Sequence, residues 1–290
     1  MREYVIFTDA TADMTEAFVQ KEGIRVLPMQ YEMDGEVYTY CRDWTDEQIH
    51  AFYDLLRNGK TATTSQIAPF IYNEAFEAVL KEGKDILYVC FSSGLSATIQ
   101  SARLAIEELS KAYPEQKIIC VDSLGATSGE TLVVEAAAEC RGRGLSVEEC
   151  AEYLNARVKN MAHWFTVDDL MFLKRGGRIS ATTAILGSAL QIKPVMHVDD
   201  EGHLVAVDKV RGRKLAMKAI ANKLKETAIE PEKQTIYICH GDVKEEAEQI
   251  AQRIRETVAV KDIVILPLTP IIGVHSGPGT LAVFFWAEQR

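Results

Sequence analysis

The stretch from residue 85 to residue 103 constrains the fold of this chain more than any other. Residues 86–91 form a short apolar run rich in β-branched and aromatic side chains, which predicts a buried strand. Apolar residues then recur from Leu95 to Tyr113 at the spacing of one helix face. A buried strand that leads directly into a helix is typical of an α/β sheet. We therefore expect a ligand site at the carboxyl end of this strand.

Ser92, Ser93 and Gly94 lie at this junction between strand and helix. The first N–H groups of a helix lack internal partners and lie at the positive end of the helix dipole, so they favour an anion. Two hydroxyls beside such a helix start predict a cradle for a carboxylate or a phosphate. The alternative is that one of the serines only caps the helix, which is the commoner use of such residues.

Strands and helices alternate along the chain up to about residue 160, which predicts a three-layer α/β/α domain with a parallel sheet over residues 1–160. Strands expected at 193–199 and 203–210 flank a hairpin turn. They predict a second domain over residues 161–290, with a mixed sheet and helices on one face. Ser180 is expected to cap a helix that ends near Leu190. Residues 61–66 are predicted to form an exposed loop by composition.

Composition and charge exclude several classes of protein. The net charge of −10 argues against a nucleic-acid partner, because phosphate binding requires a basic surface. The chain begins without the apolar core of a signal peptide, and its last apolar run, 281–287, is too short to span a bilayer. We expect a cytoplasmic protein. The cysteines show no zinc-binding spacing, so we expect no metal.

Known catalytic motifs are absent from the sequence, including the glycine-rich dinucleotide loop, the Walker loop and the zinc-protease motif. The segment G-L-S-A-T around Ser96 has half of a nucleophile elbow. A serine hydrolase is one alternative, with Ser96 or Ser93 as nucleophile, His275 as base and Asp122 or Asp169 orienting it. A phosphate-ester-binding protein is a second alternative.

Several motifs, in order along essentially the whole chain, resemble those of the DegV family of bacterial fatty-acid-binding proteins. They are F-T-D-A-T-A-D from residue 7, T-T-S-Q from 63, S-S-G-L-S-A-T from 92, V-D-S from 121, L-K-R-G-G-R-I from 173, K-P from 193 and H-S-G-P-G from 275. Small departures occur at Ala10, where serine is common, at Ala97, where glycine is usual, and at Ile67, where a proline commonly follows the glutamine. None removes a hydroxyl or a cation of the expected site.

The resemblance implies a two-domain α/β protein that holds one long-chain fatty acid in a buried tunnel between and within its domains. It implies that hydroxyls of the T-S-Q and S-S-G loops hold the carboxylate, with the late histidine nearby. On this chain the implied carboxylate-binding residues are Thr64, Ser65, Ser92, Ser93, Gly94 and His275. Arg175 and Ser276 are expected in the supporting network.

Members of the family present the carboxylate to a separate fatty acid kinase, which uses ATP to make an acyl phosphate for phospholipid synthesis. The resemblance therefore implies a carrier and not an enzyme, with no cofactor and at most transient membrane contact. Arg211 and Arg213 are expected to dock the kinase. Burial of a methylene contributes about 0.8 kcal/mol, so a sixteen-carbon chain would gain about 12 kcal/mol before ordering costs. A protonated His275 would pair with the carboxylate.

Overall fold

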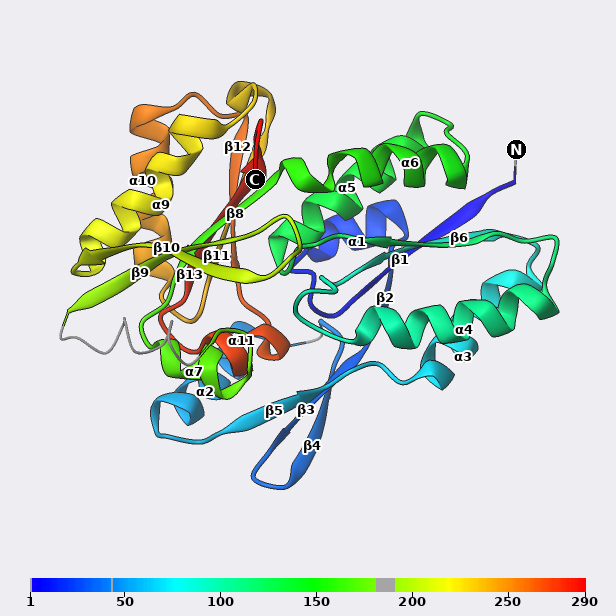
Figure 1. The fold of residues 1–290 in the computed structure, drawn as a ribbon, viewed down its shortest axis with the longest axis horizontal. Coiled ribbons are helices and arrows are strands. Elements are labelled where there is room, and N and C mark those ends of the chain that lie inside the picture. The colour runs from blue at the N-terminus through cyan, green and yellow to red at the C-terminus, as the bar shows by residue number, and fades with distance from the viewer. Residues whose placement is uncertain (1, 43, 181–190) are drawn as a thin grey trace.

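The computed structural model describes residues 2–42, 44–180 and 191–290, and it has the expected α/β fold class. A parallel sheet lies on the right in Figure 1, a mixed sheet stands on the left, and a small antiparallel sheet lies below them. The strands of the parallel sheet, in spatial order, are β2 (Arg25–Leu27), β1 (Tyr4–Asp9), β6 (Asp85–Cys90) and β7 (Ile118–Asp122).

Helices cover both faces of the parallel sheet. Alternate residues of β6 point to opposite sides of the sheet, and the residues on both sides are buried in apolar clusters. Tyr88 packs with Phe76 and Ile99 in one apolar cluster, whereas Val89 packs with Val133 in another. This confirms three layers. The helices around this sheet are α1 (Glu16–Glu22), α3 (Pro69–Lys81), α4 (Thr98–Ala112), α5 (Ser128–Gly142) and α6 (Val147–Arg157), followed by the 3-10 turn η1 (Val158–Asn160).

The second sheet is mixed, as the hairpin in the sequence predicts. Its strands, in spatial order, are β10 (Leu204–Arg211), β9 (Ile192–Val198), β8 (Met161–Thr166), β13 (Leu281–Trp286), β11 (Thr235–His240) and β12 (Asp262–Pro267). The helices α9 (Arg213–Thr227) and α10 (Lys244–Thr257) pack on one face, and the 3-10 turn η2 (Pro231–Lys233) precedes β11. The other face packs against α5.

The third sheet corrects one expectation. Residues 62–65 form strand β5 (Ala62–Ser65) and not a loop; it pairs antiparallel with β3 (Met29–Met33), which also pairs with β4 (Glu36–Tyr40). The composition of the segment suggested a loop, but its threonines are β-branched and the hydrogen bonds come from a partner strand distant in sequence. Three helices lie beside this sheet: α2 (Asp46–Arg57), α7 (Leu170–Arg175) and α11 (Pro270–Ser276).

Among the described residues, the strands before residue 160 belong to the parallel and small sheets, and those after it belong to the mixed sheet. The division into domains at residue 160 stays a prediction. The helix expected after Ser180 falls on residues 181–190, outside the described residues. In the described part of the chain, no helix combines the length and the apolar character needed to cross a bilayer.

A cluster of buried carboxyl groups lies at the end of β1, and we call Thr8, Asp9, Thr11 and Glu130 the carboxyl cluster. The Thr11 hydroxyl lies 2.5 Å from Asp9 Oδ1 and 2.6 Å from Glu130 Oε2, and Thr8 donates to Glu130 Oε1 at 2.7 Å. Because the Thr11 hydroxyl has a single hydrogen, one carboxyl must donate to it and must therefore be protonated. Burial, and then the charge of Asp9, raise the pKa of Glu130 well above its ordinary value.

Polar contacts also join residues of the first and last parts of the chain. The Thr269 backbone N–H donates to the buried Asp13 carboxylate at 3.3 Å. At the surface, His50 Nδ1 lies 2.9 Å from Asp242, and Arg57 contacts Asp242 at 2.5 Å. His50, Asp54 and Asp242 have the side-chain types of a metal site. Since Arg57 occupies the carboxylates, the group is better described as an ion-pair network.

Candidate ligand-binding site

An apolar cavity of about 270 Å³ lies between the parallel and mixed sheets. The carboxyl end of β6 forms one side of it, and β8, β13 and α11 form the other. The strand end is open here because the next helix, α4, begins only at Thr98, and the preceding loop contributes Phe91, Leu95, Ser96 and Ala97 to the cavity lining. The apolar lining includes Phe91, Leu95, Ala126, Phe165, Leu268, Ile271 and Ala282.

A second cavity, of about 360 Å³, lies against one end of the apolar cavity, and we call it the vestibule. It is more polar, and the exposed residues Thr61 and Arg175 are among those that line it. Thr64, Arg178 and His275 line both cavities, so we call these three residues the shared wall. Polar side chains therefore close the apolar cavity where it meets the vestibule.

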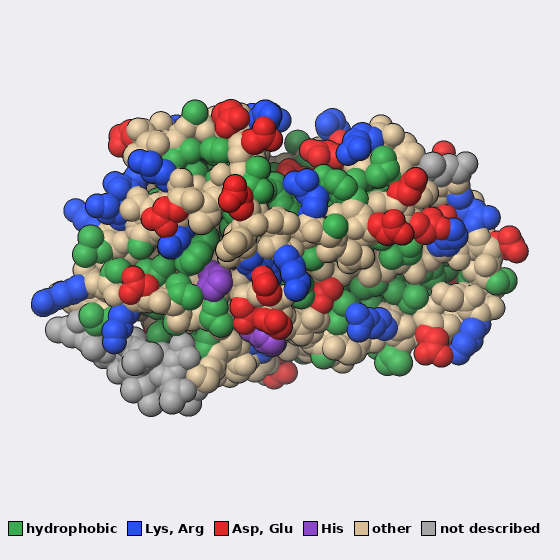
Figure 2. Space-filling model, turned by 45° about the horizontal axis from the view of Figure 1, so that its top comes forward, with side chains coloured by type: hydrophobic (Ala, Val, Ile, Leu, Met, Phe, Trp, Pro, Cys, Tyr) green, Lys and Arg blue, Asp and Glu red, His purple; other side chains and the backbone are tan. Residues whose placement is uncertain are grey.

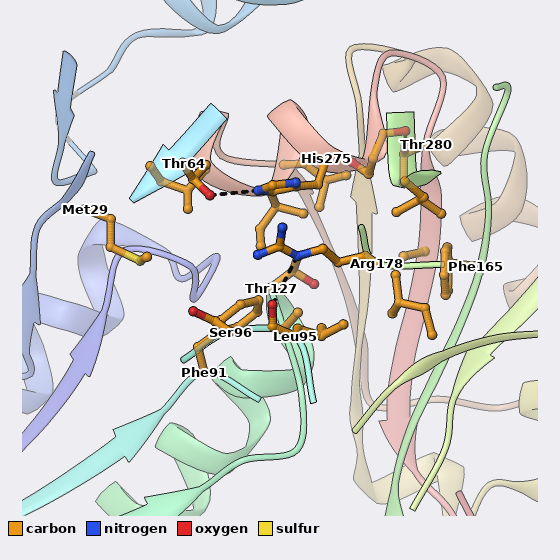
Figure 3. Close-up of a pocket in the computed structure, with 18 of the residues that line it drawn as sticks. Met29, Thr64, Phe91, Leu95, Ser96, Thr127, Phe165, Arg178, His275 and Thr280 are labelled. Carbon is orange, nitrogen blue, oxygen red and sulfur yellow. Dashed lines mark hydrogen bonds between the residues drawn. The ribbon is translucent and has the colours of Figure 1, made fainter. Parts of the chain in front are cut away.

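Thr64 and His275 meet in the shared wall although they come from β5 and α11. The Thr64 hydroxyl lies 2.7 Å from His275 Nε2 (Figure 3). Burial, and then the charge of Arg178, lower the pKa of His275 to about 3, so the ring is neutral at pH 7 in the ligand-free protein. If the proton is on Nε2, the ring donates to Thr64 and the hydroxyl proton of Thr64 is free for a ligand oxygen.

Gly176 explains how the histidine ring fits. A β-carbon at this position would collide with His275 Nδ1, so any larger residue would displace the ring. Nδ1 itself is buried and has no hydrogen-bond partner among the described residues. Gly176 is therefore required by the site, whereas Gly177, at φ +73°, is required by the turn.

Arg178 is the only cation of the shared wall, and it lies between His275 and Leu95 (Figure 3). Its Nε donates to the Leu95 carbonyl at 3.1 Å, and a second nitrogen contacts the Gly176 carbonyl. Within the described ranges no carboxylate pairs with this half-buried guanidinium, and burial lowers its pKa. An unpaired, partly buried cation favours an anionic ligand.

The structure brings together only some of the residues expected from sequence. Thr64, Ser65, His275 and Ser276 line the apolar cavity, whereas Ser92, Ser93 and Gly94 do not. Ser92 is buried and donates to the Gly202 carbonyl at 2.9 Å, and the Ser93 side chain is exposed. Arg175 lines the vestibule.

The expectation that a helix starts at Leu95, directly after these serines, is wrong. Residues 92–97 form turns because Gly94 packs against the backbone of Gly202 at the β9–β10 hairpin, where a β-carbon at Gly94 would lie 2.6 Å from the Gly202 carbonyl carbon. The helix N–H groups are therefore not beside Ser92 and Ser93, and neither serine caps α4. In the structure Ser92 connects the loop to the hairpin, and the Ser93 N–H donates to Asp122.

Sequence reasoning missed two residues of the site in their present roles. Ser96, considered only as a nucleophile, lines the cavity, and its hydroxyl lies 2.9 Å from the Thr98 hydroxyl. Arg178 stands in the K-R-G-G-R motif, but only Arg175 was chosen from it. Helix α7 ends at Arg175, and Gly177, at φ +73°, turns the chain so that Arg178 reaches the wall. The available signal in the sequence was that two arginines flank the pair of glycines, so either arginine was a candidate for the site.

The hydrolase geometry is not present among the described residues. His275 Nε2 contacts Thr64, and its Nδ1 faces Gly176 and no carboxylate. Asp122 accepts from the backbone N–H groups of Ser93 and Leu124, and Asp169 caps α7. A serine, histidine and aspartate in sequence do not form a triad without these contacts.

The two arginines expected to dock a partner differ in their surroundings. Arg213 contacts Glu246 at 2.8 Å and Asp168 at 3.4 Å, so it is engaged within the chain. Arg211, at the end of β10, is exposed. Lysine and arginine side chains gather at the left end of the face in Figure 2, the side on which β10 and α9 lie in Figure 1.

Fold and cavity together define a three-sheet α/β protein with an internal apolar cavity closed by polar side chains. The family model described as "Uncharacterised protein, DegV family" matches residues 3–288, so the chain belongs to the DegV family. A DegV domain-containing protein of Clostridium perfringens is 41% identical over 292 residues, which cover 100% of this chain and 99% of the relative.

Solved structures of the family share the fold. A fatty-acid-binding DegV family protein of Thermus thermophilus has a TM-score of 0.88 at 28% identity, covering 99% of this chain and 100% of the other. DegV of Bacillus subtilis, described as a fatty acid binding protein, has a TM-score of 0.85 at 27% identity with the same coverage. A DegV lipid binding protein of Thermotoga maritima has a TM-score of 0.86 at 28% identity, covering 99% of both chains.

Proposed function

We propose that this protein binds one long-chain fatty acid, with the acyl chain in the apolar cavity and the carboxylate at the shared wall. The observation that carries the proposal is Arg178, a half-buried cation without a carboxylate partner among the described residues, at the polar end of an apolar cavity. A carboxylate there would supply the missing charge. Fatty-acid-binding relatives with the same fold support this choice of ligand.

The carboxylate would be held by Arg178 and by the hydroxyls of Thr64 and Ser96, with His275 orienting Thr64. Ser65 and Ser276 also line the cavity and would support this head group. The contribution expected from Ser92, Ser93 and Gly94 would be indirect, since they shape the loop that carries Ser96. A carboxylate next to His275 would raise the pKa of the histidine from about 3.

We further propose that the protein presents this carboxylate to a fatty acid kinase and is a carrier, not an enzyme, in the cytoplasm. The vestibule supports this, because it joins the shared wall to exposed residues. In the reaction, a carboxylate oxygen attacks the γ-phosphorus of a nucleoside triphosphate. The bond from this phosphorus to the bridging oxygen breaks, the nucleoside diphosphate leaves with the electron pair, and an acyl phosphate for phospholipid synthesis remains on the carrier.

Native mass spectrometry of the purified protein, followed by organic extraction, tests the ligand. We expect a single bound mass that matches a long-chain fatty acid. A protein that is purified empty and also fails to take up added palmitate or oleate would contradict the proposal.

Arg211→Glu tests the kinase contact. Arg211 is exposed at the end of β10, so we expect the variant to lower acyl phosphate formation by a kinase about tenfold while palmitate affinity stays unchanged. Lys225→Glu, the same charge change at the exposed far end of α9, is the matched control and should have little effect. Equal losses in both variants, or a loss of palmitate affinity, would argue against docking at Arg211.

A further inference from the structure

The vestibule differs from the apolar cavity in the chemistry of its walls. Its outer part carries the hydroxyls of Thr61 and Thr63 and the guanidinium of Arg175, and it meets the apolar cavity at the shared wall. A group that leaves the shared wall in the direction of solvent therefore enters a polar space that contains a second arginine. This arrangement is more than a carboxylate needs, because Arg178 already matches one negative charge.

Arg175 is held in place without an ion pair. Its guanidinium lies over the Phe172 ring, 4.5 Å from the ring centroid, and no carboxylate pairs with it within residues 2–42, 44–180 and 191–290. Stacking on an aromatic ring leaves the N–H groups at the edge of a guanidinium free to donate. Such a fork of donors fits the oxygens of a phosphoryl group, which accept two parallel hydrogen bonds.

Resting on the proposed function, we propose that the vestibule is a phosphoryl-binding chamber. In the bound acyl phosphate, the acyl chain lies in the apolar cavity, the carbonyl group lies at the shared wall and the phosphoryl group lies against Arg175. Conversion of a carboxylate to an acyl phosphate raises the negative charge of the head group from one to about two, because the phosphoryl group carries that charge near pH 7. Arg178, at the shared wall, and Arg175, in the vestibule beyond it, then balance the two negative charges of the acyl phosphate.

The test uses the methylene-bridged phosphonate isostere of palmitoyl phosphate, in which carbon replaces the anhydride oxygen and prevents hydrolysis. Calorimetric titration of the full chain compares this isostere with palmitate in the wild type and in Arg175→Gln. We expect the variant to bind the isostere about tenfold more weakly, the loss of one charge-assisted contact, and to bind palmitate as the wild type does. Lys174→Gln, at the exposed neighbouring cation outside both cavities, should change neither affinity.

Four results would overturn the proposal. The wild type could bind palmitate but not the isostere, which would mean that no phosphoryl group enters the vestibule. Arg175→Gln could leave isostere affinity unchanged, or could lower the affinity for both ligands equally, which would place Arg175 at the carboxylate. Inorganic phosphate could bind the wild type as tightly as the isostere, which would mean a site for free phosphate. Failure of the wild type to bind palmitate at all would instead refute the proposed function.

Discussion

The carboxyl cluster and the shared wall are both buried groups of polar side chains, but their hydrogen bonding differs. In the carboxyl cluster, Thr11 links the two acids and Thr8 donates to Glu130, while the Tyr88 hydroxyl and the Phe91 N–H supply further donors to Asp9. In the shared wall, Arg178 lacks a carboxylate and His275 Nδ1 lacks a partner within the described residues. Since unsatisfied buried groups are costly, the first arrangement stabilises the fold and the second is suited to a ligand.

The largest expected effect concerns the carboxyl cluster. Glu130→Ala should lower the free energy of unfolding by about 3 kcal/mol, because it leaves a void and removes partners of both threonines. Palmitate affinity of the folded fraction should stay unchanged. Urea unfolding and a binding titration measure the two quantities. A loss of palmitate affinity without a loss of stability would mean that Glu130 serves ligand binding and not the fold.

Glu130→Gln is the matched variant for this cluster, because it imitates the neutral carboxyl. The folded-state pKa of Glu130 is raised by burial, so the folded protein holds a proton that the unfolded chain releases above its ordinary pKa. The contribution of Glu130 to stability is therefore full at low pH and falls as pH rises. We expect the wild type to lose stability relative to Glu130→Gln between pH 6 and pH 8.

The second prediction concerns the cation of the shared wall. Arg178→Met should weaken palmitate binding by about 100-fold, or about 2.7 kcal/mol, because it removes the charge opposite the carboxylate. The free energy of unfolding of the ligand-free protein should not fall, because the substitution removes a half-buried cation that has no carboxylate partner among the described residues. Hexadecanol, which has no charge, should bind both proteins equally. A fall in stability with unchanged palmitate affinity would make Arg178 a structural residue like those of the carboxyl cluster.

The smallest expected effect is a pH dependence at His275. The folded-state pKa of about 3 lies below the ordinary value near 6.5, so the unfolded chain binds a proton in that window and the folded protein does not. Acidification to pH 5 should therefore cost the empty wild type about 2 kcal/mol more than His275→Asn. Saturating palmitate should reduce this difference. Parallel stability curves for the two empty proteins would contradict a neutral, buried His275.

The sequence predicted those features that depend on local patterns. The strand at residues 86–91, the hairpin near Gly202 and the alternation of strands and helices before residue 160 follow from periodicity and turn residues. Thr64 and His275 were chosen from motifs, but α11, which carries His275, was not predicted. The assignment of the S-S-G turn to the head group depended on where the next helix begins. That position is set by packing of Gly94 on Gly202, a contact between segments over one hundred residues apart, which no local pattern encodes.

Arg178 was missed for a related reason. Both arginines of K-R-G-G-R have the same local chemistry, and only the direction of the turn after α7 sends one to the shared wall and the other over Phe172. Strand β5 was missed because its hydrogen bonds come from β3. The choice between neighbouring side chains therefore required tertiary structure, and the chemistry expected of the site stays a prediction.

The contact between Thr64 and His275 spans 211 residues, and this separation has a consequence for protein synthesis. A growing chain cannot close the shared wall until residue 275 has left the ribosome and α11 has packed beside β5. Before that moment, Phe91 and Leu95 after β6, and Ala126 before α5, have neither the histidine nor the last strand of the mixed sheet to complete the cavity around them. Newly made chains should therefore acquire lipid only after translation has passed this point, so loading and completion of the fold are ordered in time.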